Sequence, residues 1–407
     1  MLSLMPVTLL TLGLTIAFQL AALIALAPSR LVGDEAEYAF GGAGGGAHPL
    51  WIRVPLQGWL VRLFDRTVRL PNVGGGRMFS GCCAIAAATL ATGYVEHSHG
   101  SWAALITAAI LIVSVERAVL AIHLWPDSFL SLLLLLFALL LQDPTTATAP
   151  WLAVIASLAF AIRVDNAALV PVAVLAPLVM LPQQAPGAVL FPAAIVAVAI
   201  GALCLRSRLL FDSWLPDTTF AFNLAVARRD IAQPNATVDT LMSETARARR
   251  DTAAPAPRGR KRWSRAVSTF LIRLKTILGP ETFVAQQLVA RGVVGYRRSG
   301  LLTPPSPLAA LLKHGFTVTV ALLLLSLTRA PDGLLFVFGT FVFVYSFVQT
   351  RSRYRVALLP LLAVIVGTAL PGTVEALASG GGVPLLSVAA LLALAALLWA
   401  VPARREI

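Results

Sequence analysis

The sequence has few charged residues. They make up 13% of the 407 residues, whereas hydrophobic residues make up 58%. A soluble domain carries about 25% charged residues and cannot hide this much apolar surface from water. Lipid can take the place of water if each span satisfies its own backbone hydrogen bonds as a helix. The composition therefore predicts an integral membrane protein built from helical spans of roughly 20 residues.

Cysteine is also scarce. Cys82 and Cys83 are neighbours in one apolar run, and Cys204 lies in another. None has the spacing of a metal-ligand set, so we interpret all three as packing residues and expect no metal site made from them. The glycine run at residues 41–46 follows no strand and lacks the Lys-Ser/Thr of a P-loop. A sugar donor, if the chain uses one, is therefore expected to be borne by a lipid rather than by a nucleotide.

Long apolar runs recur along the whole chain and predict an all-α, polytopic helical bundle of about 9–12 transmembrane helices in one domain, residues 1–407. The first run is interpreted as a retained span rather than a signal peptide. The runs lie near residues 4–27, 79–94, 102–124, 129–141, 151–162, 167–181, 188–205, 316–327, 334–347, 356–370 and 384–401. The two runs on either side of Arg163–Asn166 are also compatible with one long helix.

Two polar segments interrupt the spans, at about 30–77 and 206–313. In the first, apolar residues recur with helical spacing and arginines fall on the opposite face. This pattern predicts a helix in the plane of the membrane interface, with its basic side toward lipid headgroups. The apolar positions are Leu56, Trp59, Leu60, Leu63 and Phe64, and the arginines are Arg62, Arg66 and Arg69.

The formal charge of +13 is concentrated in the 206–313 segment, which has a Pro- and Arg-rich centre. Nucleic acid is one partner for such a patch. Beside so many spans, anionic membrane lipids or phosphates fit better, so we expect no nucleic acid partner. A solvated basic loop explains the composition equally well.

Charged residues at the ends of apolar runs are the candidates for chemistry. Asp34, Glu35 and Tyr38 follow the first run, and Asp34 and Tyr38 would share one face of a helix. A carboxylate in this place could accept a proton from a hydroxyl group. The alternative is an acidic helix N-terminus.

Three further groups lie beside apolar runs, where ionisable residues usually mark a site. They are Asp127 after Pro126, the Arg163-Val-Asp165 stretch, and Arg353 with Tyr354. Arginine suits a phosphate because its planar fork donates two hydrogen bonds at once. The alternatives are a mutual ion pair for Arg163 and Asp165 and an interfacial anchor for the arginine cluster at 351–355.

The ordered motifs resemble the GT-C class of membrane glycosyltransferases. This class includes protein mannosyltransferases, aminoarabinose transferases and arabinofuranosyltransferases. The stretches that carry the resemblance are Asp34-Glu35-Ala-Glu-Tyr38, His48-Pro-Leu-Trp51, Pro126-Asp127, Arg163-Val-Asp165-Asn166, Phe211-Asp-Ser-Trp-Leu-Pro-Asp-Thr-Thr-Phe220 and Arg353-Tyr354-Arg-Val-Ala-Leu-Leu-Pro360. The chain departs from the class pattern at Asp217, where Asn is usual, and at Asn166, where Gly is usual.

The resemblance implies a hexosyl- or pentosyltransferase that uses a polyprenyl-phosphate sugar donor. The acceptor would be an envelope lipid, polysaccharide or protein on the extracytoplasmic face of the plasma (inner) membrane. It implies Asp34 as the base, with Glu35 aiding it, and Arg163 and Arg353 as the phosphate ligands. Asp127 would line the cavity, and Tyr38, His48, Asp165 and Tyr354 complete the expected substrate-binding set. Some members use a divalent cation, and the sequence leaves this open.

The same resemblance puts both polar segments outside the cytoplasm, although the positive-inside rule favours the opposite side for the shorter one. Two other functions fit many spans with basic loops. One is a transporter or flippase of lipid-linked sugars, although the inverted repeats common in transporters are not found. The other is a catalytically inactive relative, because of the departures at Asp217 and Asn166.

Overall fold

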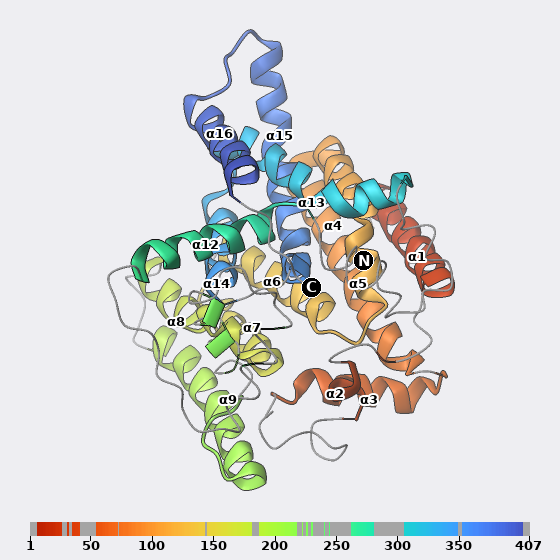
Figure 1. Ribbon diagram of the computed structural model, residues 1–407, viewed down its shortest axis with the longest axis vertical. Coiled ribbons are helices and arrows are strands. Elements are labelled where there is room, and N and C mark those ends of the chain that lie inside the picture. Colours follow the sequence, from red (N-terminus) through yellow and green to blue (C-terminus); the bar gives the residue numbers. More distant parts are fainter. Residues whose placement is uncertain are drawn as a thin grey trace.

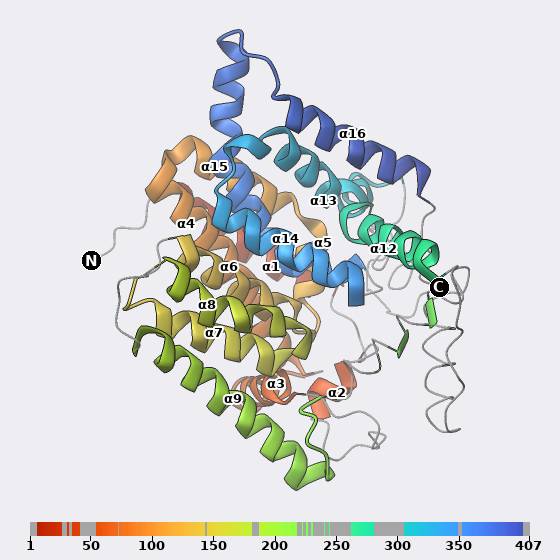
Figure 2. The same cartoon turned by 90° about the vertical axis from the view of Figure 1, so that its left-hand side faces the viewer.

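The computed structural model describes residues 6–26, 31, 35–40, 54–71, 73–142, 145–180, 187–217, 262–280, 305–348 and 352–401, together with a few single positions between 222 and 244. Within these ranges all regular elements are helical (Figures 1 and 2). They are α1 (Pro6–Leu26), α2 (Glu35–Phe40), α3 (Leu56–Val68), α4 (Gly74–Val113), α5 (Val115–Ala121), α6 (Asp127–Gln142), α7 (Ala149–Ile162), η1 (Val164–Ala168), α8 (Leu169–Met180), α9 (Gly187–Phe211), α12 (Arg262–Leu278), α13 (Pro307–Leu325), η4 (Leu327–Arg329), α14 (Asp332–Val348), η5 (Ser352–Leu358), α15 (Leu359–Ala378) and α16 (Leu385–Ala400).

The described helices support a helical membrane protein. Five of them contain segments long and apolar enough to cross a bilayer, and five more apolar helices are shorter. The long segments are Pro6–Ile24, Gly74–Val113, Leu190–Leu210, Pro307–Leu325 and Arg353–Ala378. Large side chains such as Leu385 and Trp399 are mostly exposed on the helices, as expected for surfaces in contact with lipid rather than water.

Helix α4 turns back on itself at Gly100, whose φ of 82° and ψ of 174° are not helical. The Arg117 guanidinium donates to the carbonyls of both Ala84 and Leu111, which would lie roughly 40 Å apart in a straight helix. The two halves of α4 are thus antiparallel neighbours. The expected boundary between the runs near 79–94 and 102–124 is confirmed as a tight turn.

The apolar run near 102–124 is not one helix, however. Helix α4 ends at Val113, and α5 follows after Ser114. Glu116 and Arg117 are buried there, and their hydrogen bonds require local geometry that a continuous span would not supply. The run near 151–181 is also divided. Arg163 is extended at φ −153° and ψ 126°, between α7 and the 3-10 helix η1, so the single long helix is wrong.

The helix predicted in the first polar segment is confirmed as α3, which lies crosswise to α4 in Figure 1, but the predicted separation of apolar and basic residues onto opposite faces is wrong. Its inner face, with Gln57 and Val61 fully buried, packs on the beginning of α4. Trp59 and Leu63 are 52% and 59% exposed on the outside. Arg66 is exposed beside them, so aromatic, aliphatic and basic side chains share the outer face.

The 206–313 segment includes a second amphipathic helix, α12. Arg273 of α12 donates to Asp230 at 2.8 Å, and Lys275 donates to the carbonyl of Leu398 on α16. The C-terminal flank of the Pro- and Arg-rich centre is therefore helical. The centre itself, at 245–261, lies outside the described residues.

A buried ion pair connects the middle of η5 to α5. The Arg355 guanidinium is fully buried and donates to the Glu116 carboxylate from Nε and Nη2, at 3.0 and 2.9 Å. It also donates to the Gly279 carbonyl and lies 4.9 Å from the Phe316 ring centre. Arg355 therefore joins segments from four parts of the sequence and is not an interfacial anchor.

We predict that Glu116→Ala strongly destabilises the fold. Removing one partner of a buried ion pair leaves an uncompensated charge and costs about 3–5 kcal/mol. The control is Asp212→Ala, because Asp212 pairs with Arg208 at the surface, with exposed fractions of 85% and 45%, where about 0–1 kcal/mol is usual. Thermal unfolding in detergent should separate the two variants clearly. Equal midpoints would contradict a structural role for the pair.

Candidate functional site

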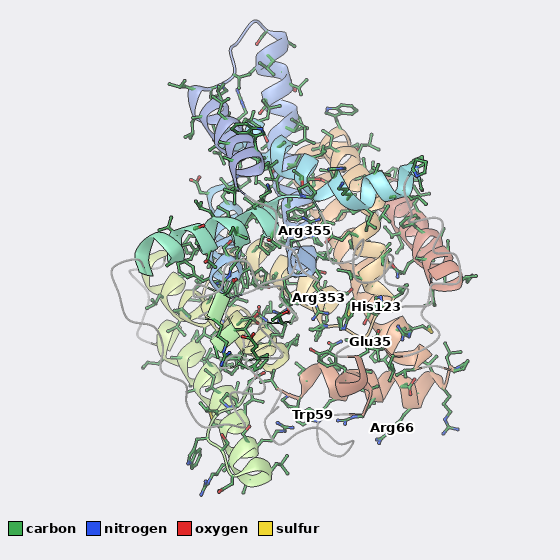
Figure 3. The ribbon with its side chains drawn as sticks, viewed as in Figure 1. Glu35, Trp59, Arg66, His123, Arg353 and Arg355 are labelled. Atoms are coloured by element: carbon green, nitrogen blue, oxygen red, sulfur yellow. The ribbon has the colours of Figure 1, made fainter. Side chains whose placement is uncertain are left out.

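Charged and aromatic side chains from distant parts of the chain meet at the centre of the molecule, where Figure 3 labels Glu35, His123 and Arg353 near one another. We call this the central polar cluster. Its members are Glu35, Arg77, His123, Trp125, Asp127, Arg163, Asp165, Tyr345, Arg353 and Tyr354. They are supplied by α2, α4, the turn after α5, the first residue of α6, the α7–η1 junction, α14 and η5.

The Glu35 carboxylate is fully buried and accepts four hydrogen bonds. Arg77 donates from Nη1 and Nη2 at 3.0 and 3.2 Å, the Leu124 amide at 2.9 Å and His123 Nδ1 at 2.9 Å. Burial alone would raise the pKa of Glu35, but the bonds from His123 and Leu124 and the charge of Arg77 lower it to about 2. A carboxylate that accepts this many hydrogen bonds is poorly suited to accept a proton. Its role is to position the groups that donate to it.

His123 is fully buried next to this carboxylate. Burial lowers the pKa of His123, and the charges of Arg77 and Arg353 act in the same direction, against the effect of Glu35. The ring is therefore neutral near pH 7. Because an ionised carboxylate only accepts, we assign the single ring proton to Nδ1, which donates to Glu35.

A row of stacked groups leads from His123 to Arg353. The His123 ring lies on the Trp125 ring, with centres 4.2 Å apart and planes 14° from parallel. The Arg353 guanidinium carbon lies 4.5 Å from the Trp125 ring centre, which is within cation–π distance. Glu35 thus fixes His123, His123 supports Trp125, and Trp125 holds the cation of Arg353.

Tyr354 lies between two cations. Its ring centre is 4.2 Å from the Arg163 guanidinium carbon and 5.2 Å from that of Arg353. Arg163 also pairs with Asp165, at 3.1 Å from Nε, and lies 3.6 Å from Asp127 Oδ1. The ion pair expected between Arg163 and Asp165 is confirmed. Both guanidinium groups are nevertheless held against one aromatic ring, which is an arrangement suited to an anion with several oxygens.

The structure brings together six of the nine site residues expected from the sequence: Glu35, Asp127, Arg163, Asp165, Arg353 and Tyr354. Tyr38 is buried one helical turn from Glu35, within an apolar cluster that includes Val61 and Trp125. Asp34 and His48 lie outside the described residues. Asp217 comes near the first polar segment, because its carboxylate is 3.5 Å from the Val54 amide.

Sequence reasoning missed four members of the cluster: Arg77, His123, Trp125 and Tyr345. Arg77 directly precedes an apolar run, and His123 lies in the last residues of another. Both positions meet the criterion that selected Asp127 and Arg163, a polar group beside an apolar run. The signal was therefore present, although the partner of each residue could not be inferred.

We predict that His123 makes the protein less stable as the pH falls from about 7 to 5. A neutral buried histidine binds no proton while the unfolded chain does, so stability rises with pH by up to about 1.4 kcal/mol per pH unit. Glu35 does not change the stability in this pH range. The stability that comes from its lowered pKa is lost only below the pKa of this group in the unfolded chain, about 4.5.

The test is thermal unfolding of His123→Phe at several pH values between 5 and 7. The variant keeps a ring to stack on Trp125 but cannot titrate, so its unfolding midpoint should depend less on pH than that of the natural protein. His97→Phe is the control, since His97 is exposed. An unchanged pH slope in His123→Phe would show that His123 is already charged in the folded state.

Comparison with known proteins adds no assignment to this geometry. No protein-family model matches the chain, and no curated protein or solved structure matches it significantly.

Proposed function

We propose that the chain is a membrane glycosyltransferase that takes a pentose or hexose from a polyprenyl-phosphate donor. The observation that carries the proposal is the pair of guanidinium groups, Arg163 and Arg353, on the ring of Tyr354 at 4.2 and 5.2 Å. Arginine forks match phosphate oxygens, and aromatic rings with neighbouring carboxylates suit a sugar. The many apolar helices suit a donor with a hydrocarbon chain.

In the proposed reaction, a hydroxyl oxygen of the acceptor attacks the anomeric carbon as the bond from that carbon to the phosphate oxygen breaks. The phosphate leaves with the electron pair, and Arg163 and Arg353 stabilise its growing negative charge. The acceptor proton passes to the carboxylate of Asp34, which directly precedes α2 in the sequence. Glu35 acts as a positioning residue through His123 and Trp125. A divalent cation is not required by this scheme.

The proposal assigns the reaction to the extracytoplasmic face of the plasma (inner) membrane. The acceptor is then an envelope lipid, polysaccharide or protein, and α3 and the 206–313 segment lie outside the cytoplasm. Trp59, Leu63 and Arg66 on the outer face of α3 suit an interface with anionic lipids, in which the apolar groups enter the lipid and the arginine meets headgroups.

A flippase for lipid-linked sugars is the second candidate, because it too would need phosphate ligands beside apolar helices. It would not need a base, so the two functions differ in their dependence on Asp34. A catalytically inactive relative would bind the donor without transferring the sugar.

We predict that Arg353→Lys impairs transfer although it keeps the positive charge. A point charge cannot replace a fork that grips two oxygens, nor the flat stacking on Trp125. The loss should be greatest at low donor concentration, as a raised KM for polyprenyl-phosphate sugars. Arg66→Lys, at the exposed face of α3, is the control. Equal activity of both variants at low donor would remove Arg353 from the donor site.

Asp34→Asn should abolish transfer while expression and membrane insertion stay normal. The change keeps the shape of the side chain and removes the proton acceptor, a loss that usually costs about 10²–10⁴-fold in rate. Sugar transfer is measured in membranes supplied with a panel of polyprenyl-phosphate pentoses and hexoses. Asp212→Asn, at an 85% exposed side chain, is the matched control. Near-normal transfer by Asp34→Asn would show that Asp34 is not the base, whereas no transfer by the natural protein with any donor of the panel would favour the flippase.

A further inference from the structure

Gln57 is a polar residue on the inner face of α3 to which the proposed reaction gives no role. Its side chain is fully buried, and Nε2 donates to the carbonyl of Leu124 at 3.0 Å and to that of Trp125 at 3.5 Å. These partners lie 67 and 68 positions further along the chain. The Gln57 carboxamide therefore connects α3 to the turn after α5, which carries part of the central polar cluster.

The backbone at Leu124 is held from two sides. Its amide donates to the Glu35 carboxylate at 2.9 Å, and its carbonyl accepts from Gln57. One turn after Gln57, Val61 belongs to the same buried apolar cluster as Leu124 and Trp125. The inner face of α3 thus contacts this turn with one polar and one apolar side chain, and the position of Trp125 depends on α3 as well as on Glu35.

Trp125 passes this constraint on to Arg353. The guanidinium carbon of Arg353 lies 4.5 Å from the centre of the Trp125 ring, and a cation–π contact requires the cation to stay over the ring face. A planar fork that grips two phosphate oxygens must be held within about 0.5 Å of its productive position. A shift of the Trp125 backbone would therefore displace the fork of Arg353.

We propose that Gln57 is a positioning residue for phosphate binding, because it fixes the backbone of Trp125 and Trp125 fixes the guanidinium of Arg353. The inference rests on the proposed function, which places a lipid phosphate at Arg353. It adds the interfacial helix α3 to the elements that support this site. Gln57 itself does not touch the ligand, so its effect on affinity is transmitted through Trp125.

The test measures the binding of undecaprenyl phosphate to the purified full chain in lipid nanodiscs. Gln57→Met keeps an unbranched side chain of similar length but removes the donor. We expect its Kd to rise about tenfold, a ratio that corresponds to about 1.4 kcal/mol and lies within the cost of one buried hydrogen bond left unmade. Gln57→Leu, which also lacks the donor, is the second variant, so the result does not depend on one substitution folding.

The matched control is Thr107→Val. The Thr107 hydroxyl is fully buried and donates to the carbonyls of Ala103 in α4 and Ala363 in α15. Its loss should lower the midpoint of thermal unfolding, as the loss of Gln57 does, but leave the Kd for undecaprenyl phosphate unchanged. The comparison separates positioning of the phosphate site from a contribution to stability alone.

A double variant tests the route through Arg353. If Gln57 acts on the fork of Arg353, Gln57→Met should add little to the loss already caused by Arg353→Lys, so the two effects are not additive. A normal Kd in both Gln57 variants, or a full tenfold loss on top of Arg353→Lys, overturns the positioning role and leaves the proposed function intact. If the natural protein does not bind undecaprenyl phosphate, the proposed function fails together with the positioning role.

Discussion

A charge in a low-dielectric interior must be neutralised, and in this protein the buried Glu35 carboxylate brings several segments together for that reason. It accepts bonds from Arg77 at the start of α4 and from His123 and Leu124 in the turn after α5. An isolated buried carboxylate would be far too costly, so these segments must come together for any of them to be buried. The position of Trp125, and with it that of Arg353, follows from this arrangement.

The cluster also shows how several cations can be kept inside an apolar bundle. Within the cluster, Arg77 is neutralised by Glu35, and Arg163 by Asp165 with Asp127 close by. Outside it, Arg355 is neutralised by Glu116. Arg353 also lies against the rings of Trp125 and Tyr354, and aromatic faces attract a cation. The central polar cluster thus combines fixed ion pairs with guanidinium groups held by rings.

Local periodicity allowed the sequence to predict α3, the boundary at Gly100 and the close pair of Arg163 and Asp165. It also identified most residues of the cluster, because each is a polar residue beside an apolar run. Local periodicity could not identify the long-range partners of these residues. Glu35 and His123 are 88 positions apart, and Glu116 and Arg355 are 239 apart. Such pairs depend on how the helices pack, which the spacing of one sequence does not encode.

The same limit explains why the helices differ from the apolar run near 102–124. The mean hydropathy of residues 102–124 is that of one span, because the two charged residues Glu116 and Arg117 barely change it. In the structure these two residues lie just after the end of α4, where Glu116 pairs with Arg355 of η5 and Arg117 donates to the Ala84 carbonyl in the first half of α4. In an apolar chain, the few charged residues therefore determine helix ends more strongly than the many hydrophobic ones.

The two arginines of the short 3-10 helix η5 have different roles. A 3-10 helix turns about 120° per residue, so Arg353 and Arg355 point in different directions, one toward Trp125 and the other toward Glu116. Inserting a single residue between them would place the two arginines three residues, or one full turn, apart, so that both would point in the same direction and one of the two contacts would be lost. The length of this stretch is therefore as strongly constrained as its composition.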